Sequence, residues 1–223
     1  MRVSIIIPVF NEAKIVPGLL DNLRDLPAEI IFVDGDSTDN TAGLVRASGF
    51  RCLAAPRGRA TQMNAGAGAA HGDVLLFQHA DTVMPQGFLQ TVRRAIDAGA
   101  VGGSFDLRLD TTRPLLRLVG LMITLRSRLT GVSTGDQGMF VTRAAFNELG
   151  GFAEQPLFED VDMSVRLRRV GKTCRLRPPA LTSPRRWEHG GTIRTVLRMW
   201  VLRSLYYGGV SVERLARHYG AAR

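Results

Sequence analysis

Cysteine, aromatic side chains and long apolar runs are all scarce in this sequence of 223 residues. Its two cysteines, Cys52 and Cys174, are far apart, which excludes a disulfide framework and a zinc site built from cysteine pairs. Buried thiols in a reducing compartment are the expected alternative. The longest nearly unbroken apolar run, Leu118 to Leu125, is bounded by arginines and is too short to cross a bilayer. The sequence therefore predicts a globular protein that does not span a membrane.

A signal peptide is missing as well. The apolar stretch after Met1 and Arg2 ends at Asn11 and Glu12, so it is shorter than the apolar core of a secretion signal. We therefore expect a cytoplasmic protein, with the inner face of the membrane as the alternative location.

Positive charge is what the sequence has in excess, with a formal net charge of +9. Between Arg185 and Arg223 there are eight arginines against Glu188 and Glu213, so this last segment carries +6 of the total. A basic surface attracts nucleic acids, anionic membranes or polyanionic substrates. Only 7% of the residues are aromatic and no recognition motif for nucleic acids is present, so nucleic-acid binding is the least favoured of the three.

The first half of the sequence alternates apolar, β-branched runs with segments of helical periodicity. Pro8 interrupts the first run, so a buried strand is expected to end there and enter a loop. The expected elements that follow are helix 11–26, strand 29–34, helix 38–48, strand 52–54, helix 59–70 and strand 74–78. Repeated βαβ units imply parallel strands joined by right-handed crossovers. We therefore predict a doubly wound, Rossmann-like α/β sheet, mostly parallel, with helices on both faces.

The second half loses this rhythm and becomes mainly helical. The expected elements are helix 86–98, strand 102–109 and helices 113–129, 142–149, 161–170 and 193–206. No internal repeat, low-complexity tract or convincing linker interrupts the chain. One domain over residues 1–223 is therefore expected, with a helical C-terminal part.

Acidic side chains follow two of the expected strands. Asp34 and Asp36 follow the second strand and Asp81 follows the fourth, at the edge where open α/β sheets bind ligands. A carboxylate at such an edge can accept a hydrogen bond from a base N–H or a ribose hydroxyl, and Asp81 could hold Mg²⁺ or Mn²⁺ against a diphosphate. Helix capping is the alternative for Ser37 and Asp39, and a simple turn is the alternative for Asp81 alone.

A further acidic cluster opens the helix expected over 161–170. Glu159 and Asp160 could supply a general base, which takes a proton from an acceptor hydroxyl. Acidic residues at a helix start also suit the helix dipole, so part of this cluster is explained by structure alone.

Six ordered motifs resemble those of family 2 glycosyltransferases, which have the GT-A fold. The resemblance covers almost the whole chain, and its pieces are Ile7 to Glu12, Val33 to Asp39, Arg57 to Arg59 with Asn64 and Gly66, His79 to Asp81, Gly135 to Gly138, and Phe158 to Asp160. Within the family the chain is most similar to a short bacterial branch associated with radical-SAM and selenoprotein-type domain proteins.

This resemblance implies a nucleotide-sugar donor, with UDP favoured, in the half 1–110, and an acceptor site in the basic helical half 111–223. It also implies a role for each matching position, and a single displacement with inversion at the anomeric carbon. The implied roles are the nucleoside pocket for Pro8, Phe10 and Glu12, the uracil or ribose for Asp34 or Asp36, the diphosphate for Arg59, a Mg²⁺ or Mn²⁺ ligand for Asp81, the border of the acceptor sugar for Gly135, Asp136 and Gln137, and the general base for Asp160 with Glu159 beside it.

The chain departs from the family pattern at two positions. His79 stands where the family usually has the first aspartate of its metal motif, which predicts weaker or differently tuned metal binding. Asp34 and Asp36 are separated by a glycine, whereas the family more often has two adjacent aspartates before Gly. A metal-ligand role for His79 is less favoured than a histidine bonded to backbone beside the strand end.

The segment after residue 184 offers further candidates. Arg185, Arg186 and Trp187 are expected to grip the diphosphate, because guanidinium groups match phosphate oxygens. His189 lies where many family members supply a late metal or phosphate contact, and a solvated loop histidine is an equal alternative.

Two segments could form a membrane-facing surface. Arg113, Arg117, Arg126 and Arg128 accompany the apolar residues Leu118 to Leu125, and helix 193–206 carries Trp200 among arginines. A solvated face is the default explanation, and an interfacial surface that reaches membrane-held acceptors is the alternative. The sequence is also compatible with a homodimer.

Two rival functions were weighed against sugar transfer. A sugar nucleotidyltransferase would need a Gly-rich, Arg-bearing phosphate loop directly after the first strand, and Pro8 to Glu12 is no such loop. A degenerate module that binds a nucleotide sugar or a membrane without catalysis is favoured only by His79.

Overall fold

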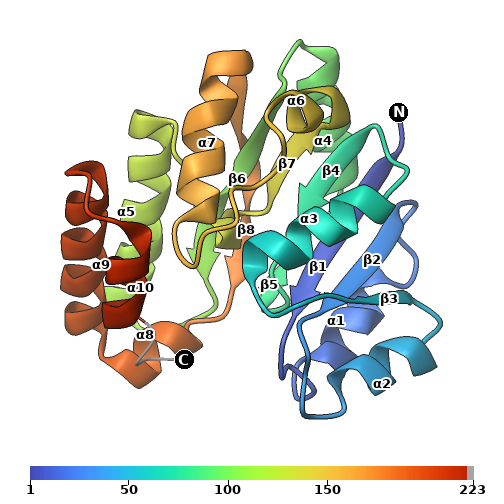
Figure 1. Ribbon diagram of the computed structural model, residues 1–223, viewed down its shortest axis with the longest axis horizontal. Helices are drawn as coiled ribbons and strands as arrows, with labels where there is room; N and C mark the ends of the chain where they lie inside the picture. Colours follow the sequence, from blue (N-terminus) through green and yellow to red (C-terminus); the bar gives the residue numbers. More distant parts are fainter. Residues whose placement is uncertain (220–223) are drawn as a thin grey trace.

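One mixed sheet of eight strands forms the centre of the molecule (Figure 1). The computed structural model describes residues 1–219, apart from the side chains of residues 189 and 190. In spatial order the sheet runs β3-β2-β1-β4-β7-β6-β8-β5. The strands are β1 (Val3–Val9), β2 (Glu29–Asp34), β3 (Arg51–Ala54), β4 (Val74–Phe77), β5 (Thr82–Val83), β6 (Gly102–Leu109), β7 (Met139–Thr142) and β8 (Thr173–Thr182).

Helices cover both faces of this sheet. One face packs against α1 (Val16–Leu23), α2 (Thr41–Ala47) and α4 (Phe88–Asp97). The other face packs against α3 (Arg59–Ala69), α6 (Arg143–Glu148) and α7 (Glu159–Val170). The helical end of the molecule is formed by α5 (Pro114–Thr130), α8 (Arg185–Gly190), α9 (Thr192–Tyr207) and α10 (Val212–Tyr219).

The parallel part of the sheet explains the continuous apolar run near the amino end. β1 pairs in parallel with β2 on one side and with β4 on the other, so it is buried on both faces. Ile5 packs into the α1 layer while Ile6 packs into the α3 layer. Gly66 lets α3 approach closely, because a Cβ there would lie 2.4 Å from Cγ2 of Ile6.

The second half of the sheet is mixed. β7 is antiparallel to both β4 and β6, β8 is parallel to β6, and β5 is antiparallel to β8. Strand β8 contains Pro178 and Pro179, which cannot donate to a ladder. The register shifts where they occur, between the pairs Phe105 with Leu176 and Leu107 with Ala180, so the prolines sit in an irregular segment.

The structure agrees with the predicted architecture and adds elements to it. The order β3-β2-β1-β4 is parallel throughout, as the repeated βαβ units indicate. Strands β5, β7 and β8 and helices α8 and α10 were not predicted. Among the described residues, the helices are too short or too polar to cross a membrane.

Candidate active site

The loops after β1 and β2 are joined at the carboxyl edge of the parallel strands. The side-chain Oδ1 of Asn11 accepts hydrogen bonds from the backbone N–H groups of Thr38 (2.8 Å) and Asp39 (3.3 Å). In return, the Asn11 N–H donates to Oγ of Ser37 at 2.9 Å. These reciprocal bonds hold the first two predicted ligand loops as one unit.

Backbone strain is concentrated at the same motifs. Among the described non-glycine residues, positive φ angles occur at Asn11 (53°), Asp36 (61°) and Phe158 (64°). Asn and Asp tolerate this left-handed region, whereas a bulky residue such as Phe rarely adopts it. Such strain typically persists where surrounding structure fixes a functional loop, and all three residues lie in motifs that were expected to bind ligand.

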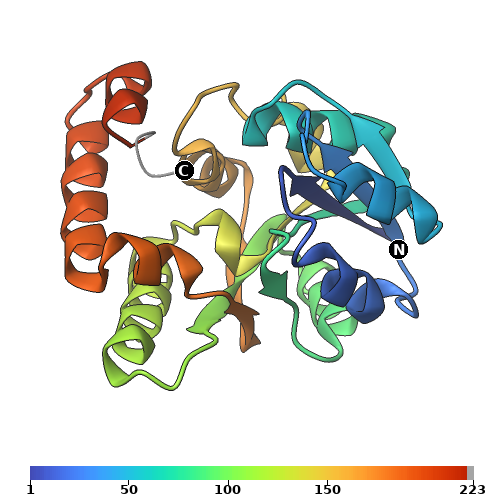
Figure 2. The ribbon, with the colours of Figure 1, turned by 90° about the horizontal axis from the view of Figure 1, so that it is seen from below.

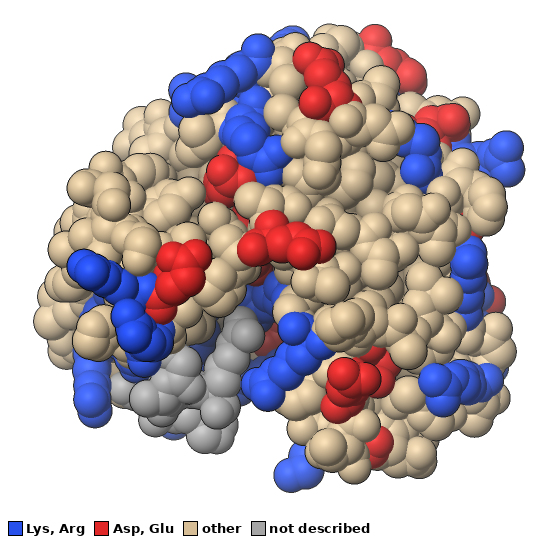
Figure 3. Space-filling model, in the orientation of Figure 1, with Lys and Arg blue, Asp and Glu red and all other residues tan. Residues whose placement is uncertain are grey.

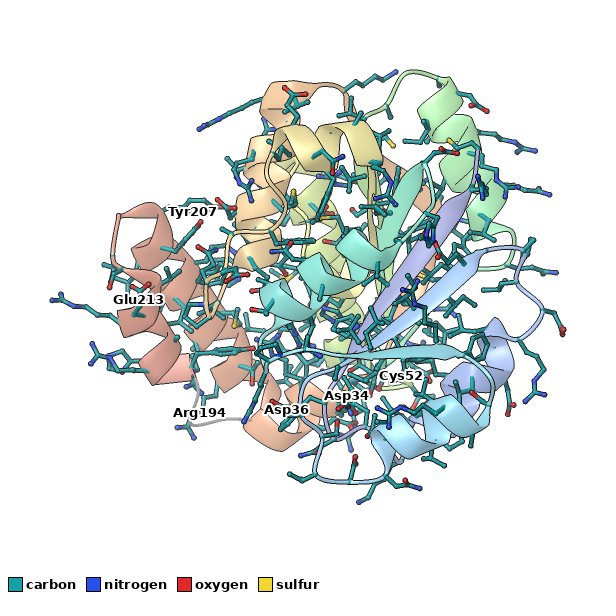
Figure 4. The ribbon with its side chains drawn as sticks, turned by 45° about the vertical axis from the view of Figure 1, so that its right-hand side comes forward. Asp34, Asp36, Cys52, Arg194, Tyr207 and Glu213 are labelled. Carbon is teal, nitrogen blue, oxygen red and sulfur yellow. The ribbon has the colours of Figure 1, made fainter. Side chains whose placement is uncertain are left out.

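Asp34 is the buried carboxylate of the second loop. Its Oδ2 accepts the Ser37 N–H at 3.1 Å, while its buried Oδ1 has no hydrogen-bond partner among the described residues. Asp36 is exposed and lies close to Asp34 at the lower edge of the molecule (Figure 4). The carboxylate with unsatisfied hydrogen-bonding capacity is therefore Asp34.

Gln62 is a site residue that sequence reasoning missed. From α3, its Nε2 donates to the carbonyl oxygens of Val9 (2.9 Å) and Val33 (2.8 Å), so it bridges the ends of β1 and β2. A Cβ at Gly35 would lie 2.8 Å from this amide, which explains the glycine between the two aspartates. Nothing in the spacing of α3 marks Gln62 in advance.

Pro8 and Phe10 form the wall of the first loop. Pro8 is half-buried and pairs in register with Val33 of β2. The ring of Phe10 stacks under the guanidinium group of Arg57, with Cζ 4.1 Å from the ring centroid. A cation over an aromatic face fixes the orientation of both groups, so this pair shapes one side of the edge.

Arg185 links the helical end to the carboxyl edge. Its Nη1 and Nη2 donate to the two carboxylate oxygens of Glu12, at 2.7 and 2.5 Å, and its Nε donates to Oδ2 of Asp81 at 3.0 Å. Bidentate arginine–carboxylate pairs combine charge with fixed geometry. We call this three-residue arrangement the Arg185 clasp. It places a cation where the sequence predicted a diphosphate.

Asp160 lies opposite the clasp, at the beginning of α7. Its Oδ2 accepts the Gly135 N–H at 2.7 Å, and its Oδ1 accepts the Val161 N–H at 2.7 Å. Asp160 and Gly135 line a hollow together with His79, whose ring lies against Gly135 so closely that a Cβ there would be 2.4 Å from Nε2. The backbone therefore holds the Asp160 carboxylate in a fixed orientation.

Glu159 and Arg59 flank this hollow. Glu159 is buried, and its Oε1 lies 4.0 Å from Nη1 of the half-buried Arg59 at the beginning of α3. The pair spans α3 and α7, so it positions the Arg59 guanidinium beside Asp160. In this structure Glu159 therefore forms an ion pair with Arg59.

Asp136 provides a second carboxylate oxygen without a partner. Its Oδ1 is buried and has no hydrogen-bond partner among the described residues. Burial raises the pKa of Asp136, and the nearby carboxylates of Asp160 and Asp81 act in the same direction. Asp81, Asp136 and Asp160 are therefore close enough to interact electrostatically.

Gln137 and Trp187, which were both predicted to contact a ligand, are buried in the structure. Gln137 is fully buried, and its Nε2 donates to the Phe105 carbonyl and to Ser127 Oγ, both at 3.0 Å, so its amide holds β6 and α5. Trp187 packs against Leu116 and Val119 of α5. Both side chains are therefore buried in this structure, and their contacts with a ligand stay predictions.

Arg186 contacts the last two helices of the chain. The Nη2 of Arg186 approaches Sδ of Met199 at 3.0 Å, and its Cζ lies 5.1 Å from the ring centroid of Tyr219. Arg186 therefore points toward α9 and α10. The side chain of His189 is outside the described residues, so its predicted role stays a prediction.

Charges of both signs occur around the molecule. On the face shown in Figure 3, acidic and basic side chains are interspersed. The net positive charge therefore does not form one continuous basic surface on this face.

The carboxyl edge offers few oxygen ligands for a divalent cation. Among the described residues, no group of three His, Cys, Asp or Glu side chains could hold a metal ion. Mg²⁺ often binds through one or two carboxylates together with waters and substrate phosphates. Asp81 fits that arrangement as the protein ligand. The residues therefore fit a cation carried largely by a diphosphate and do not fit one held by the protein alone.

Solved structures with the same fold include several sugar-transfer enzymes. A mannosyltransferase from Pyrobaculum calidifontis, in complex with GDP-Man and Mn²⁺, has a TM-score of 0.64 at 24% identity and covers 82% of this chain and 56% of that one. S. aureus TarS 1–349, in complex with UDP, has a TM-score of 0.65 at 18% identity and covers 82% of this chain and 60% of that one. These likenesses confirm the predicted GT-A type fold.

Two glycosyltransferases of similar sequence are longer than this chain. A pre-mycofactocin glycosyltransferase from Mycobacterium tuberculosis is 28% identical over 238 aligned positions, which cover 97% of this chain and 48% of that protein. An undecaprenyl-phosphate 4-deoxy-4-formamido-L-arabinose transferase from Serratia proteamaculans is 30% identical over 155 positions, 61% of this chain and 47% of that protein. The chain thus spans about half the length of these relatives.

A family model described as glycosyl transferase family 2 matches residues 4–149. This match covers more than half of the chain, and it includes the loops that carry Glu12, Asp34, Asp81 and Asp136. The chain therefore belongs to glycosyl transferase family 2.

Proposed function

We propose that this chain transfers one sugar, with inversion, from a nucleotide-sugar donor to a hydroxyl acceptor. The observation that carries this proposal is a pair of buried carboxylate oxygens at the same edge of the sheet, Oδ1 of Asp34 and Oδ1 of Asp136, which have no hydrogen-bond partner in the described part of the chain. Buried polar atoms are nearly always hydrogen-bonded, so each of these oxygens calls for a donor group on a ligand. A ribose or base suits Asp34, and an acceptor hydroxyl suits Asp136.

Asp160 is the proposed general base. The acceptor O–H bond breaks and its proton passes to the Asp160 carboxylate, while the acceptor oxygen bonds to the anomeric carbon. The bond from that carbon to the diphosphate breaks on the opposite side, and its electron pair stays on the phosphate oxygen. One displacement of this kind inverts the anomeric centre. The backbone N–H groups of Gly135 and Val161 keep the carboxylate oriented for this task.

Cationic side chains stabilise the leaving group in this scheme. Arg59 and Arg185 lie beside Asp160 and Asp81, where negative charge develops on the diphosphate. When bound, a divalent cation would add positive charge to the same phosphates, with Asp81 as its protein ligand. Binding of a diphosphate would loosen the Arg185 clasp, because phosphate oxygens compete with Glu12 and Asp81 for the guanidinium group.

The donor and the branch of the family are part of this proposal. UDP is favoured by the sequence resemblance and supported by relatives of the same fold that were solved with UDP. The likeness to a pre-mycofactocin glycosyltransferase supports the radical-SAM-associated branch. Residues 1–110 would hold the donor, and residues 111–223 would hold the acceptor within one domain.

A non-catalytic module that binds a nucleotide sugar is the second candidate. It is favoured by the Arg185 clasp, because Asp81 already forms an ion pair with Arg185, and by His79, which stands in place of the first carboxylate of the metal motif. Turnover separates the two candidates.

The test is release of nucleoside diphosphate from a panel of nucleotide sugars, with Mn²⁺ or Mg²⁺ and with EDTA. Asp160→Asn should lower turnover by about 10² to 10⁴-fold, the usual contribution of a general base, while donor affinity by calorimetry changes little. Asp81→Ala should remove the metal dependence. The exposed Asp25→Asn is the matched control, since it makes the same chemical change far from the edge. Donor binding without release, at any acceptor tried, would establish the non-catalytic module.

A further inference from the structure

Exposed apolar side chains are concentrated on two helices at one end of the molecule. Among the described residues, all large apolar side chains that are exposed lie on α5 or α9, except Met1 and Val83. On α5 they are Leu115, Leu118, Leu121, Met122, Leu125 and Leu129, and on α9 they are Ile193, Leu197, Trp200, Val201, Leu205 and Tyr207. Patches of this kind mark interaction sites in soluble domains.

The spacing of these residues places them on one outer stripe of each helix. On α5, Leu118, Leu121, Met122 and Leu125 recur at intervals of three and four, so they share a face. The opposite face of α5 carries Leu116 and Val119, which pack into the core. A helix that is apolar on both faces normally has an apolar partner on each side. The inner side of α5 is covered by this chain, and its outer side is not.

The two helices form one surface. Ile123 of α5 and Val196 of α9 pack against the same apolar cluster, so the helices are in contact beneath their outer stripes. In both Figure 1 and Figure 2 they lie at the end of the molecule opposite the N-terminus. We call the twelve exposed side chains on α5 and α9 the apolar helix surface.

The charge on these two helices has a single sign. Together α5 and α9 contain six arginines and no Asp or Glu. Arg117 and Arg194 are exposed, and no acidic side chain among the described residues forms a salt bridge with either. Arg194 stands at the beginning of α9, and Tyr207 stands at its other end (Figure 4). Apolar residues with Trp at the centre and arginines at the rim are typical of helices that lie in a membrane interface.

We propose that the apolar helix surface docks the protein on an anionic lipid bilayer. Leu121, Leu129 and Trp200 are 63%, 77% and 64% exposed, so they can enter the boundary between headgroups and acyl chains without unfolding the helices. Arg117 and Arg194 would reach the lipid phosphates from the rim, because long cationic side chains extend toward the headgroups.

A second copy of this chain fits the surface less well. A twofold interface brings the same patch of both copies together, so the exposed Arg117 and Arg194 of each copy would approach those of the other, and α5 and α9 carry no carboxylates to pair with them. An anionic leaflet instead supplies the opposite charge over the whole patch. The arrangement therefore favours lipid over self-association.

The apolar helix surface is linked to the carboxyl edge through one short helix. Helix α8 connects the two regions: Arg185 reaches Glu12 and Asp81 at the edge, while Trp187 packs under α5. The docking itself does not depend on any catalytic role of that edge.

Vesicle co-sedimentation tests this proposal. The full chain is incubated with vesicles of phosphatidylcholine alone, or of phosphatidylcholine with phosphatidylglycerol, at low and at physiological salt. We expect sedimentation with the anionic vesicles that weakens as salt screens the charges. The double variant Leu121→Glu/Trp200→Glu should lose at least about tenfold in vesicle affinity, because it places two carboxylates in the apolar stripe.

The charge variants provide a matched pair. Arg117→Glu/Arg194→Glu should weaken vesicle binding by about tenfold or more, since each basic residue near an anionic surface contributes about 1 kcal/mol. Arg24→Glu/Arg46→Glu makes the same change in net charge on exposed residues at the other end of the molecule, and should change binding by much less. Thermal unfolding and nucleotide binding check that every variant is folded.

Three outcomes would overturn the proposal. The wild-type chain could stay in the supernatant at low salt, or both charge variants could lose binding equally, which would indicate a general attraction of a basic protein. The third is a wild-type dimer that Leu121→Glu/Trp200→Glu converts to a monomer, with no vesicle binding by either. Because none of these measurements involves turnover, they are independent of the proposed function.

Discussion

The parallel half of the sheet and the apolar helix surface use similar apolar residues in opposite ways. In β1, Ile5, Ile6 and Ile7 are fully buried between two layers of helices. In α5, Leu118, Leu121 and Leu125 face outward while their neighbours pack inward. The comparison shows that an apolar run alone does not tell whether its partner belongs to the same chain. What distinguishes the two cases is whether one face or both faces of the element are covered by other parts of the folded chain.

A pair of leucine substitutions gives the largest expected contrast in stability. Leu76→Ala removes a fully buried side chain from β4 and should lower the free energy of unfolding by about 2 to 5 kcal/mol, because it leaves a cavity. Leu121→Ala removes an exposed side chain and should change it by less than about 0.5 kcal/mol. Urea unfolding at constant m-value measures both. A comparable loss in Leu121→Ala would mean that its outer face is already packed in solution.

The amino edge of the parallel half gives the next contrast, in pH dependence. Burial acts to raise the pKa of Glu29, but hydrogen bonds from His71 and Ser4 outweigh it and lower the pKa from 4.5 to about 2. The Ser4 Oγ and the His71 N–H donate to Oε2 at 2.5 and 2.7 Å. Because the folded-state pKa is depressed, this stabilisation is present above about pH 4.5 and is lost as the pH falls toward 2.

Glu29→Gln should therefore destabilise the fold by about 1 to 3 kcal/mol at neutral pH and flatten the loss of stability between pH 4.5 and 2. The exposed Glu148→Gln is the control and should leave the acid limb unchanged. Unfolding curves at a series of pH values give the comparison. An acid limb in Glu29→Gln as steep as in the wild type would assign the effect to other carboxylates.

The Arg185 clasp gives the smallest expected effect on global stability. It links the carboxyl edge to the helical end of the molecule but buries little surface. Its guanidinium group is about two-fifths exposed, so Arg185→Gln should cost about 1 kcal/mol or less in global stability. Hydrogen exchange of residues 185–207 should nevertheless become severalfold faster, while β1 and β2 stay protected. The exposed Arg24→Gln serves as control. Unchanged exchange in α8 and α9 would show that Trp187 alone fixes the helical end.

Most of the fold could be predicted because local pattern and tertiary environment agree in the first half. Parallel strands buried on both faces are continuous apolar runs, and the helices between them show one apolar stripe. Strand β8 could not be predicted in this way, since Pro178 and Pro179 argue against a strand. It forms because β6 offers a complete edge and the prolines fall where the register shifts.

The candidate site was predictable in its loops but not in its side-chain partners. Strand ends indicate that Asp34 and Asp81 lie at one edge, since parallel strands end together, and the family resemblance adds Asp160 at a helix start. No local pattern can show that Arg185 bonds to Glu12, because 173 positions separate them. The burial of Gln137 and Trp187 could not be predicted for the same reason: their residue types suit a binding site, and only tertiary packing shows that they are buried.

The Arg185 clasp also has a consequence for synthesis on the ribosome. The parallel strands β3-β2-β1-β4 all lie before residue 78, so they can pair once that length has emerged. Arg185 follows about a hundred residues later, which at roughly 5 to 20 residues per second is a delay of about 5 to 20 seconds. During that interval Glu12 and Asp81 have no arginine between them. The parallel strands can therefore pair on the nascent chain before the Arg185 clasp can form.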